Sequence, residues 1–139
     1  STLAVLAQGA AAAGLPVLAL VDARMGEVYA GAFMPGDDGC VRPLGEESVL
    51  PPAMVDAPAP RFAGVGTGFG AYGGMLRERL GSALAQVAPD ALPHAADLAR
   101  LAARDFAAGL GVDALQAQPV YLRDKVALTL AEQGKPTPA

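Results

Sequence analysis

Cysteine and histidine are almost absent: the 139-residue chain has one of each, Cys40 and His94. A single cysteine excludes a framework of internal disulfides and fits a reducing compartment. A zinc or iron site needs about three His, Cys or carboxylate ligands, and the chain has neither a His-x-x-x-His nor a His-Glu-x-x-His pattern. The sequence therefore predicts no metal site and argues against a metallopeptidase that acts through these residues.

The signals of a nucleophilic enzyme are missing as well. No Gly-x-Ser-x-Gly elbow occurs, and Cys40 has no histidine near it in the sequence. We interpret Cys40 as a structural thiol. His94 follows a proline at an expected helix start, and we interpret it as a helix-terminus residue. We therefore assign no catalytic residue to this chain.

Positive charge and long apolar runs are also scarce. Lys and Arg number 10 against 14 Asp and Glu, which gives a net charge of −4. Binding nucleic acid requires a basic surface, so we expect this domain not to bind nucleic acid directly. No apolar run reaches the length of a membrane span, and no basic segment precedes the small apolar residues 10–15 as in a signal peptide. We expect a cytoplasmic protein without a membrane partner.

Aromatic residues are few, with no Trp, four Phe and three Tyr, although 53% of the residues are hydrophobic. Much of that fraction is alanine, which buries little area, so the core must rely on close packing of its elements. A chain of this length allows one domain that buries about two-thirds of its unfolded surface.

The clearest local pattern is a hairpin. An apolar run over residues 17–21 is followed by a short charged loop and then by a strand-like run over residues 28–34. Gly26 supplies the positive φ that such a loop needs near its exit. The second run has apolar residues on both faces, which is typical of a central strand.

The hairpin loop carries three charged residues, Asp22, Arg24 and Glu27. These side chains either pair with one another, which at an exposed loop is worth about 0–1 kcal/mol, or contact a partner or ligand. The sequence leaves both interpretations open, with a slight preference for structural pairing.

The remaining patterns predict helices layered on a sheet. We expect a first helix that Ser1 or Thr2 caps and that ends after Ala13, where Gly14 and Pro16 follow. Short strands are expected over 40–44 and 48–50, a strand over 62–65, and a helix from about Ala71 with an apolar face that includes Leu84. A further helix is expected from His94 to Leu110, with Arg100 and Arg104 solvated and with an apolar stripe made of Leu98, Leu101, Ala102, Phe106 and Leu110. Residues 132–139, rich in Gly and Pro, are expected to form a disordered tail.

A Gly-rich turn separates the expected strand over 62–65 from the helix that follows. Gly66, Thr67 and Gly68 begin a loose Gly-x-Gly-x-x-Ala pattern, and free N–H groups at a helix start attract anions. The supporting βαβ unit is not evident. A tight turn without a ligand is therefore the favoured interpretation, and phosphate binding is the alternative.

Four stretches resemble the TsaB (YeaZ) family in the order in which that family has them. They are Ser1-Thr2-Leu3 with Ala7-Gln8-Gly9-Ala10, Asp22-Ala23-Arg24-Met25-Gly26-Glu27-Val28-Tyr29, the Gly-rich strand end over 62–68, and the stretch over 118–127 that begins Gln-Pro-Val-Tyr-Leu-Arg. Together they span nearly the whole chain. The resemblance implies an α/β fold, namely an actin-like (ASKHA, ribonuclease-H-like) domain with a mixed sheet flanked by helices. It also implies that residues 1–131 are the C-terminal domain of a two-domain protein whose first domain is absent here.

The resemblance further implies a role in making threonylcarbamoyladenosine in tRNA. In that family a separate enzyme makes threonylcarbamoyl-adenylate, and a metal-dependent partner, TsaD, transfers the threonylcarbamoyl group. TsaB proteins support TsaD without catalysis of their own, and an ATPase, TsaE, joins the complex. We expect no cofactor in this domain, and ATP or ADP is a candidate cofactor of the full complex. Pairing with TsaD, or self-pairing as a homodimer, is attributed chiefly to the first domain. This chain alone is therefore expected neither to replace the whole protein nor to bind TsaD tightly.

The resemblance leaves a vestigial nucleotide site as an alternative. In actin-like enzymes the hairpin at Asp22 corresponds to a phosphate loop that has Asp-x-Gly, and Arg24 replaces that glycine here. The turn over 66–68 corresponds to an adenosine contact. A glycoprotease-type peptidase, a label often attached to relatives of this family, is the least favoured alternative.

The C-terminal signature contributes two further candidate interaction residues, Tyr121 and Arg123. Pro119 fixes an extended segment there. We expect Tyr121 and Leu122 to pack on the sheet. Arg123, Asp124 and Lys125 are expected to face water or the first domain. Docking of the C-terminal segment is favoured over a direct contact with a partner.

Overall fold

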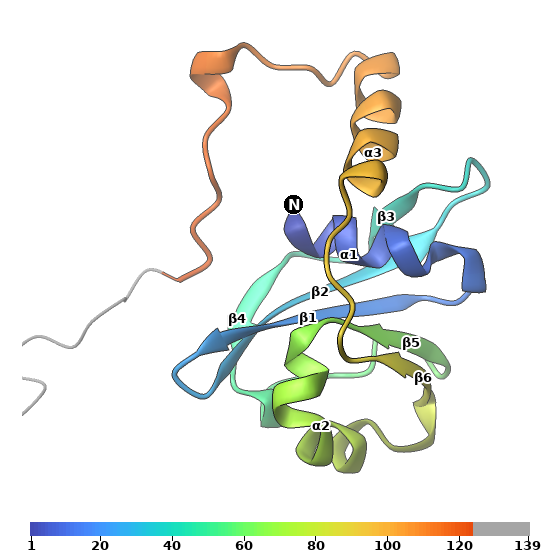
Figure 1. The fold of residues 1–139 in the computed structure, drawn as a ribbon, viewed down its shortest axis with the longest axis vertical. Helices are drawn as coiled ribbons and strands as arrows, with labels where there is room; N and C mark the ends of the chain where they lie inside the picture. The colour runs from blue at the N-terminus through green and yellow to red at the C-terminus, as the bar shows by residue number, and fades with distance from the viewer. Residues whose placement is uncertain (124–139) are drawn as a thin grey trace, which may run out of the picture.

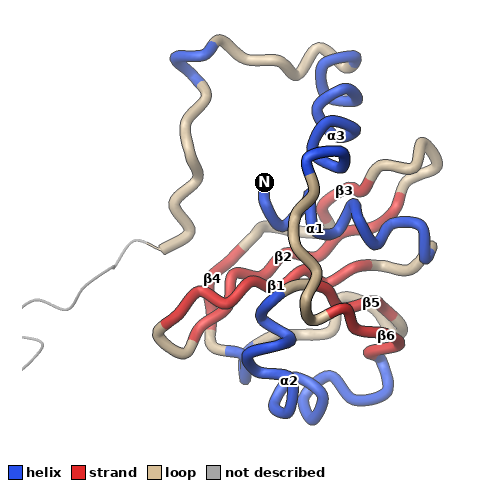
Figure 2. The backbone as a smooth tube through the Cα atoms, viewed as in Figure 1, coloured by secondary structure: helices blue, strands red, loops and turns tan. Residues whose placement is uncertain are grey.

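The structure, a computed structural model, describes residues 1–123 (Figure 1). The expectations for Asp124, for Lys125 and for the tail over 132–139 lie outside the described residues. Figure 2 shows a sheet enclosed by helices on both sides. The elements are α1 (Thr2–Ala10), β1 (Val17–Arg24), β2 (Glu27–Pro35), β3 (Val41–Pro43), β4 (Ser48–Leu50), β5 (Phe62–Val65), α2 (Thr67–Leu80), β6 (Leu84–Ala88) and α3 (Ala95–Ala107).

Over residues 1–123 the sheet is mixed and has six strands, in the order β3-β2-β1-β5-β6 with β4 also paired to β2. The pairs β1–β2, β2–β3 and β2–β4 are antiparallel, whereas β1–β5 and β5–β6 are parallel. β2 is a central strand, as predicted from its two apolar faces. The expected α/β fold, a mixed sheet flanked by helices, is confirmed.

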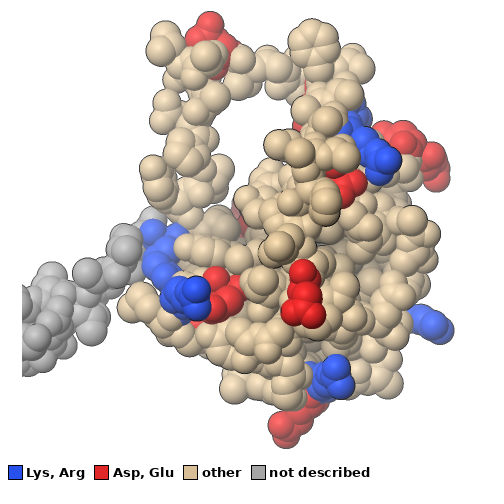
Figure 3. Space-filling view, viewed as in Figure 1, with Lys and Arg blue, Asp and Glu red and all other residues tan. Residues whose placement is uncertain are grey.

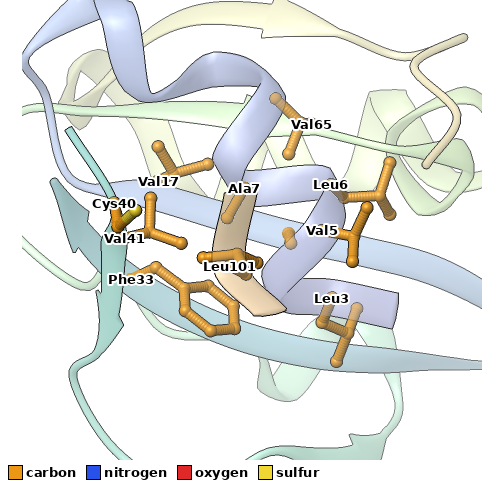
Figure 4. Close-up of a cluster of buried hydrophobic side chains, with 11 residues drawn as sticks. Leu3, Val5, Leu6, Ala7, Val17, Phe33, Cys40, Val41, Val65 and Leu101 are labelled. Atoms are coloured by element: carbon orange, nitrogen blue, oxygen red, sulfur yellow. The ribbon is translucent and has the colours of Figure 1, made fainter. Parts of the chain in front are cut away.

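Alternation along β1 divides the core into two layers. Val17 and Ala19 point toward α1, while Leu18 and Leu20 point toward α2, because successive side chains of a strand face opposite sides. Figure 4 shows the first layer, in which small and branched side chains of α1 pack against the sheet and against Leu101 of α3. Alanine and valine allow this close approach, as the composition suggested.

The helix α1 is fixed at both ends by features that the sequence predicts. The side chain of Ser1 accepts a hydrogen bond from the backbone N–H of Ala4 at 3.1 Å, which caps the helix. A 3₁₀ turn then ends at Gly14, whose φ is 67°. Gln8 is buried, and its side chain joins this helix to the segment that enters β3.

The helix and strand after the Gly-rich turn differ from the prediction. α2 begins at Thr67 rather than Ala71, and Leu84 is the first residue of β6 rather than part of the helix face. β6 is a short strand at the edge of the sheet, and most of its residues are exposed. It therefore lacks the apolar alternation by which a half-buried strand is found in a sequence.

The apolar stripe of α3 is also less buried than predicted. Leu101 is 7% exposed, whereas Phe106 is 82% exposed and Leu98 and Leu110 are exposed too. Arg104 was expected to be solvated, but its Nη1 donates to the carbonyl of Val41 at 2.8 Å. α3 packs mainly on α1 rather than on the sheet. Leu101 is therefore the residue of the stripe that enters the core. None of the helices in the described part of the chain has the length and apolar character that crossing a membrane requires.

Candidate functional site

The candidate site lies at one edge of the sheet, where β1 and β5 end and α2 begins. β1 pairs antiparallel with β2 on one side and parallel with β5 on the other. At this edge the chain continues from β1 through the hairpin into β2, whereas from β5 it continues into α2. The connections after these two neighbouring parallel strands therefore diverge. Ligand sites of open α/β sheets occur at such positions.

The hairpin that closes β1 and β2 has a tight turn with an unusual backbone. Met25 and Gly26 form the turn with φ values of 56° and 78°, the pattern of a type I′ hairpin. Arg24 also has a positive φ, 61°, beside a bulge in the strand pairing. The positive φ predicted for Gly26 is confirmed. Nothing in the sequence indicated that Arg24 and Met25 would share it.

Asp22 holds this hairpin from within. Its carboxylate accepts from the backbone N–H of Arg24 at 2.9 Å and from Arg24 Nη1 at 3.1 Å, while the Arg24 side chain is 87% exposed. The Tyr72 hydroxyl donates to the same carboxylate at 3.4 Å. Burial, and then the charge of Asp22, raise the pKa of Tyr72. The predicted pairing of Asp22 with Arg24 is therefore present.

Glu27 has a different partner from the one expected. Its Oε2 accepts from Nη2 of Arg123 at 2.5 Å, and Nη1 of Arg123 donates to the carbonyl of Ala23 at 3.0 Å. The Arg123 guanidinium lies 5.9 Å from the centre of the Tyr29 ring, within the range of a cation–π contact. The two signature stretches, which are about a hundred residues apart, meet here.

The C-terminal segment thus docks through a different residue from the predicted one. Tyr121 was expected to pack on the sheet but is 78% exposed, whereas Arg123 was expected to face water or the first domain and is largely covered by the hairpin. The guanidinium finds an acidic partner and an aromatic face on the hairpin, and these outweigh the simple expectation that a charged residue stays solvated.

The Gly-rich turn packs against the chain's own residues. A Cβ at Gly66 would lie 2.4 Å from the carbonyl oxygen of Leu20, and one at Gly68 would lie 2.7 Å from the Cβ of Leu20. Thr67 Oγ1 accepts from the backbone N–H of Asp22 at 3.2 Å, which ties the turn to the end of β1. Close packing between strand and helix explains these glycines, as the favoured interpretation required.

A groove of about 750 Å³ lies beside the hairpin, between the start of α1 and the C-terminal segment. Ser1 and Glu47, whose side chains are hydrogen-bonded, stand on one wall with Val21 and Tyr29. Residues 118–123 form the other wall. Figure 3 shows the opening between this segment and the body of the protein, and basic and acidic side chains are interspersed over the visible face.

The other candidate groups lie apart from this edge. Cys40 is buried next to β3, and His94 is the N-cap residue of α3, which confirms its predicted place at a helix terminus. Within residues 1–123, no three His, Cys, Asp or Glu side chains stand close enough together to hold a metal ion.

Comparison with known proteins identifies relatives that match most of the chain. The chain is 37% identical, over 138 residues, to the tRNA threonylcarbamoyladenosine biosynthesis protein TsaB of Escherichia coli K12, a match that covers 91% of the chain. YeaZ from Pseudomonas aeruginosa superposes with a TM-score of 0.76 at 43% identity over 87% of the chain. The chain belongs to the TsaB (YeaZ) family.

A second Pseudomonas aeruginosa structure, described as an uncharacterized protein with similarity to peptidase YeaZ, is 44% identical over 88% of the chain, also with a TM-score of 0.76. The solved members have the actin-like fold, so the predicted fold family is confirmed. The chain spans 57% of the length of each of these relatives. A scan against protein-family models gave no match.

Proposed function

We propose that the chain is the C-terminal domain of a TsaB-type subunit that supports the TsaD transferase in making threonylcarbamoyladenosine in tRNA. The observation that carries the proposal is the 37% identity to the Escherichia coli TsaB protein over nearly the whole chain. The domain itself contributes a rigid framework rather than a reacting group, and the subunit works in a complex with TsaD and TsaE.

The geometry of the candidate site supports a framework role. The Asp22 carboxylate is used by Arg24 and Tyr72, and the Glu27 carboxylate is used by Arg123. The turn over 66–68 is filled by the chain's own Leu20. Carboxylates that already accept hydrogen bonds from the chain's own side chains stabilise the fold. They are poorly placed to act as a general base or to bind a metal ion.

The test is restoration of the tRNA modification. The longer protein that contains this domain is expressed in cells depleted of their own TsaB, and threonylcarbamoyladenosine is measured in digested tRNA by mass spectrometry. We expect the modification to return and the protein to copurify with TsaD. A soluble, folded protein that restores no modification and binds no TsaD would overturn the proposal.

A second function, nucleotide binding by a vestigial site, is favoured by one observation. The turn at Gly66 and Thr67 opens α2 at the carboxyl ends of β1 and β5, where helix N–H groups attract phosphate. Thermal-shift titration with ATP and ADP tests it. A saturable rise in the unfolding midpoint would support this function, and no shift at millimolar nucleotide would exclude it.

One solved relative is described as similar to a peptidase, so peptidase activity is an alternative function that metal content can test. A metallopeptidase requires about one equivalent of bound metal. Elemental analysis of the purified protein, together with a casein hydrolysis assay, gives a direct answer. We expect no stoichiometric transition metal, and about one equivalent together with chelator-sensitive hydrolysis would contradict the proposed framework role.

A further inference from the structure

The C-terminal arm, residues 108–123, leaves the end of α3 and arches back to the hairpin (Figure 1). Its hydrogen bonds before Arg123 are local: Asp113 accepts from the N–H groups of Leu115 and Gln116, and Gln118 bonds within its own turn. Leu115 and Val120 are more than four-fifths exposed. None of these hydrogen bonds joins the arm to the body before residue 123, although the side chain of Leu122 is half-buried.

Arg123 contacts the hairpin at several points. Its guanidinium donates to the Glu27 carboxylate and to the Ala23 carbonyl, lies near the sulfur of Met25 at 3.8 Å, and covers the Tyr29 ring. The side chain of Arg123 is 14% exposed and that of Glu27 is 32% exposed. A partly covered, charge-assisted contact of this kind is stronger than an ordinary surface ion pair.

The hairpin that receives Arg123 has the most unusual backbone among the described residues. Arg24 and Met25 both have positive φ although neither is glycine. Backbone of this kind persists only where the surroundings enforce it. Asp22 braces the turn at the Arg24 N–H, and Arg123 braces it at the Ala23 carbonyl on the preceding residue.

We propose that Arg123 is a latch, a positioning residue that closes the C-terminal arm onto the β1–β2 hairpin and fixes the shape of both. The latch also completes the groove described above, because residues 118–123 form one of its walls. Release of Arg123 opens that wall while the sheet and its two core layers stay intact. This inference concerns the arm and the hairpin and holds whatever the function of the protein.

A distance measurement between the arm and the body tests the latch. Spin labels are placed at Val120→Cys in the arm and Glu78→Cys in α2, both exposed positions, in a Cys40→Ala background. We expect a narrow distance distribution in the otherwise unchanged protein. Arg123→Gln should broaden it and shift it to longer distances, because the arm loses its tether.

Three further variants make the test specific. Glu27→Gln should broaden the distribution in the same direction, which keeps the test decisive if Arg123→Gln fails to fold. Arg123→Lys should rescue it in part, because an ammonium keeps the charge but cannot span Glu27 and Ala23 as a fork. The control is Arg42→Gln, which breaks the Arg42–Asp38 pair away from the arm and should leave the distribution narrow.

The result also distinguishes a latch from a general contribution to stability. With a latch, the far-UV circular dichroism of Arg123→Gln stays the same and only the arm distance and the amide exchange of residues 23–27 change. Unchanged distances in both Arg123→Gln and Glu27→Gln would overturn the proposal. Equal loss of amide protection across the whole sheet would overturn it too.

Discussion

Gly66 lies directly against the carbonyl group of Leu20, so close that a Cβ at position 66 would fall 2.4 Å from the Leu20 oxygen. The φ of Gly66 is 101°, a region that side-chain-bearing residues rarely adopt. Both facts require glycine where β5 turns into α2. The contact places the start of α2 beside the end of β1.

Gly66→Ala should therefore destabilise the protein strongly. Backbone strain and the clash with Leu20 act together, and we expect a loss of about 2–4 kcal/mol in the free energy of unfolding. Urea denaturation measures it. Gly74→Ala in the middle of α2 is the control: a Cβ there meets nothing within 4 Å, and alanine should stabilise the helix by about 0.5–1 kcal/mol. Equal behaviour of the two variants would contradict the strained turn.

Two residues on the apolar stripe of α3 should respond differently to truncation, because one is buried and the other is exposed. Leu101→Ala empties a buried site in the layer beneath α1, for which we expect a loss of about 2–4 kcal/mol. Phe106→Ala removes a side chain that is 82% exposed and should change stability by less than about 0.5 kcal/mol. Thermal and urea unfolding of both variants check this. A large effect of Phe106→Ala would mean that the Phe106 side chain is covered in the folded protein.

Gln8 should be important for the stability of the fold, because its buried side chain bonds to two backbone groups. Its amide donates to the carbonyl of Gly39 at 2.8 Å and accepts from the N–H of Val41 at 2.9 Å, so it satisfies two backbone groups of the β2–β3 connection. Gln8→Leu leaves both groups unpaired, and we expect a loss of about 2–4 kcal/mol. Gln86→Ala, at an exposed position of β6, is the matched control and should be nearly neutral. A Gln8→Leu protein as stable as the parent would show that these bonds are dispensable.

The turn before β3 should give a measurable pH dependence. Hydrogen bonding from Arg42, and then from the Cys40 N–H, lowers the pKa of Asp38 from 3.8 to about 2. Because the folded pKa lies below the ordinary value, the charged carboxylate stabilises the fold above that value. The stabilisation is lost as the pH falls toward 2.

Asp38→Asn removes this titrating group and supplies the comparison. We expect the parent to be more stable than the variant near neutral pH, and the difference to shrink between about pH 5 and pH 2. Urea unfolding at several pH values measures the difference. A difference that stays constant or grows as the pH falls would contradict the lowered pKa of Asp38.

The sequence predicted the hairpin, the central strand β2 and the cap of α1 because these depend on near neighbours. A strand alternates every two residues, a turn needs glycine at a fixed place, and a helix start needs a hydroxyl. The sequence missed β6 because an exposed edge strand carries little alternation. It missed the positive φ of Arg24 because the contact that accompanies it, from the Arg24 N–H to the Asp22 carboxylate, is not visible as a turn signal in the sequence.

The candidate site was predicted as a set of residues but not as an arrangement. Asp22, Arg24, Glu27 and Arg123 were all named from the sequence, and the pairing of Asp22 with Arg24 follows from their closeness in the chain. The contact between Arg123 and Glu27 joins residues 96 positions apart. Only the path of the arm back from α3 places the two side chains together.

The sequence by itself determined the family, the layered α/β fold and the glycines of the strand-to-helix turn, because each rests on patterns that a short stretch of chain carries. The tertiary structure alone decided that Arg123 is covered and Tyr121 exposed, and that most of the α3 stripe faces outward. The physical reason is that burial depends on what other segments bring to a position. A guanidinium that meets a carboxylate and an aromatic ring is held there, whereas an apolar residue that meets nothing stays exposed.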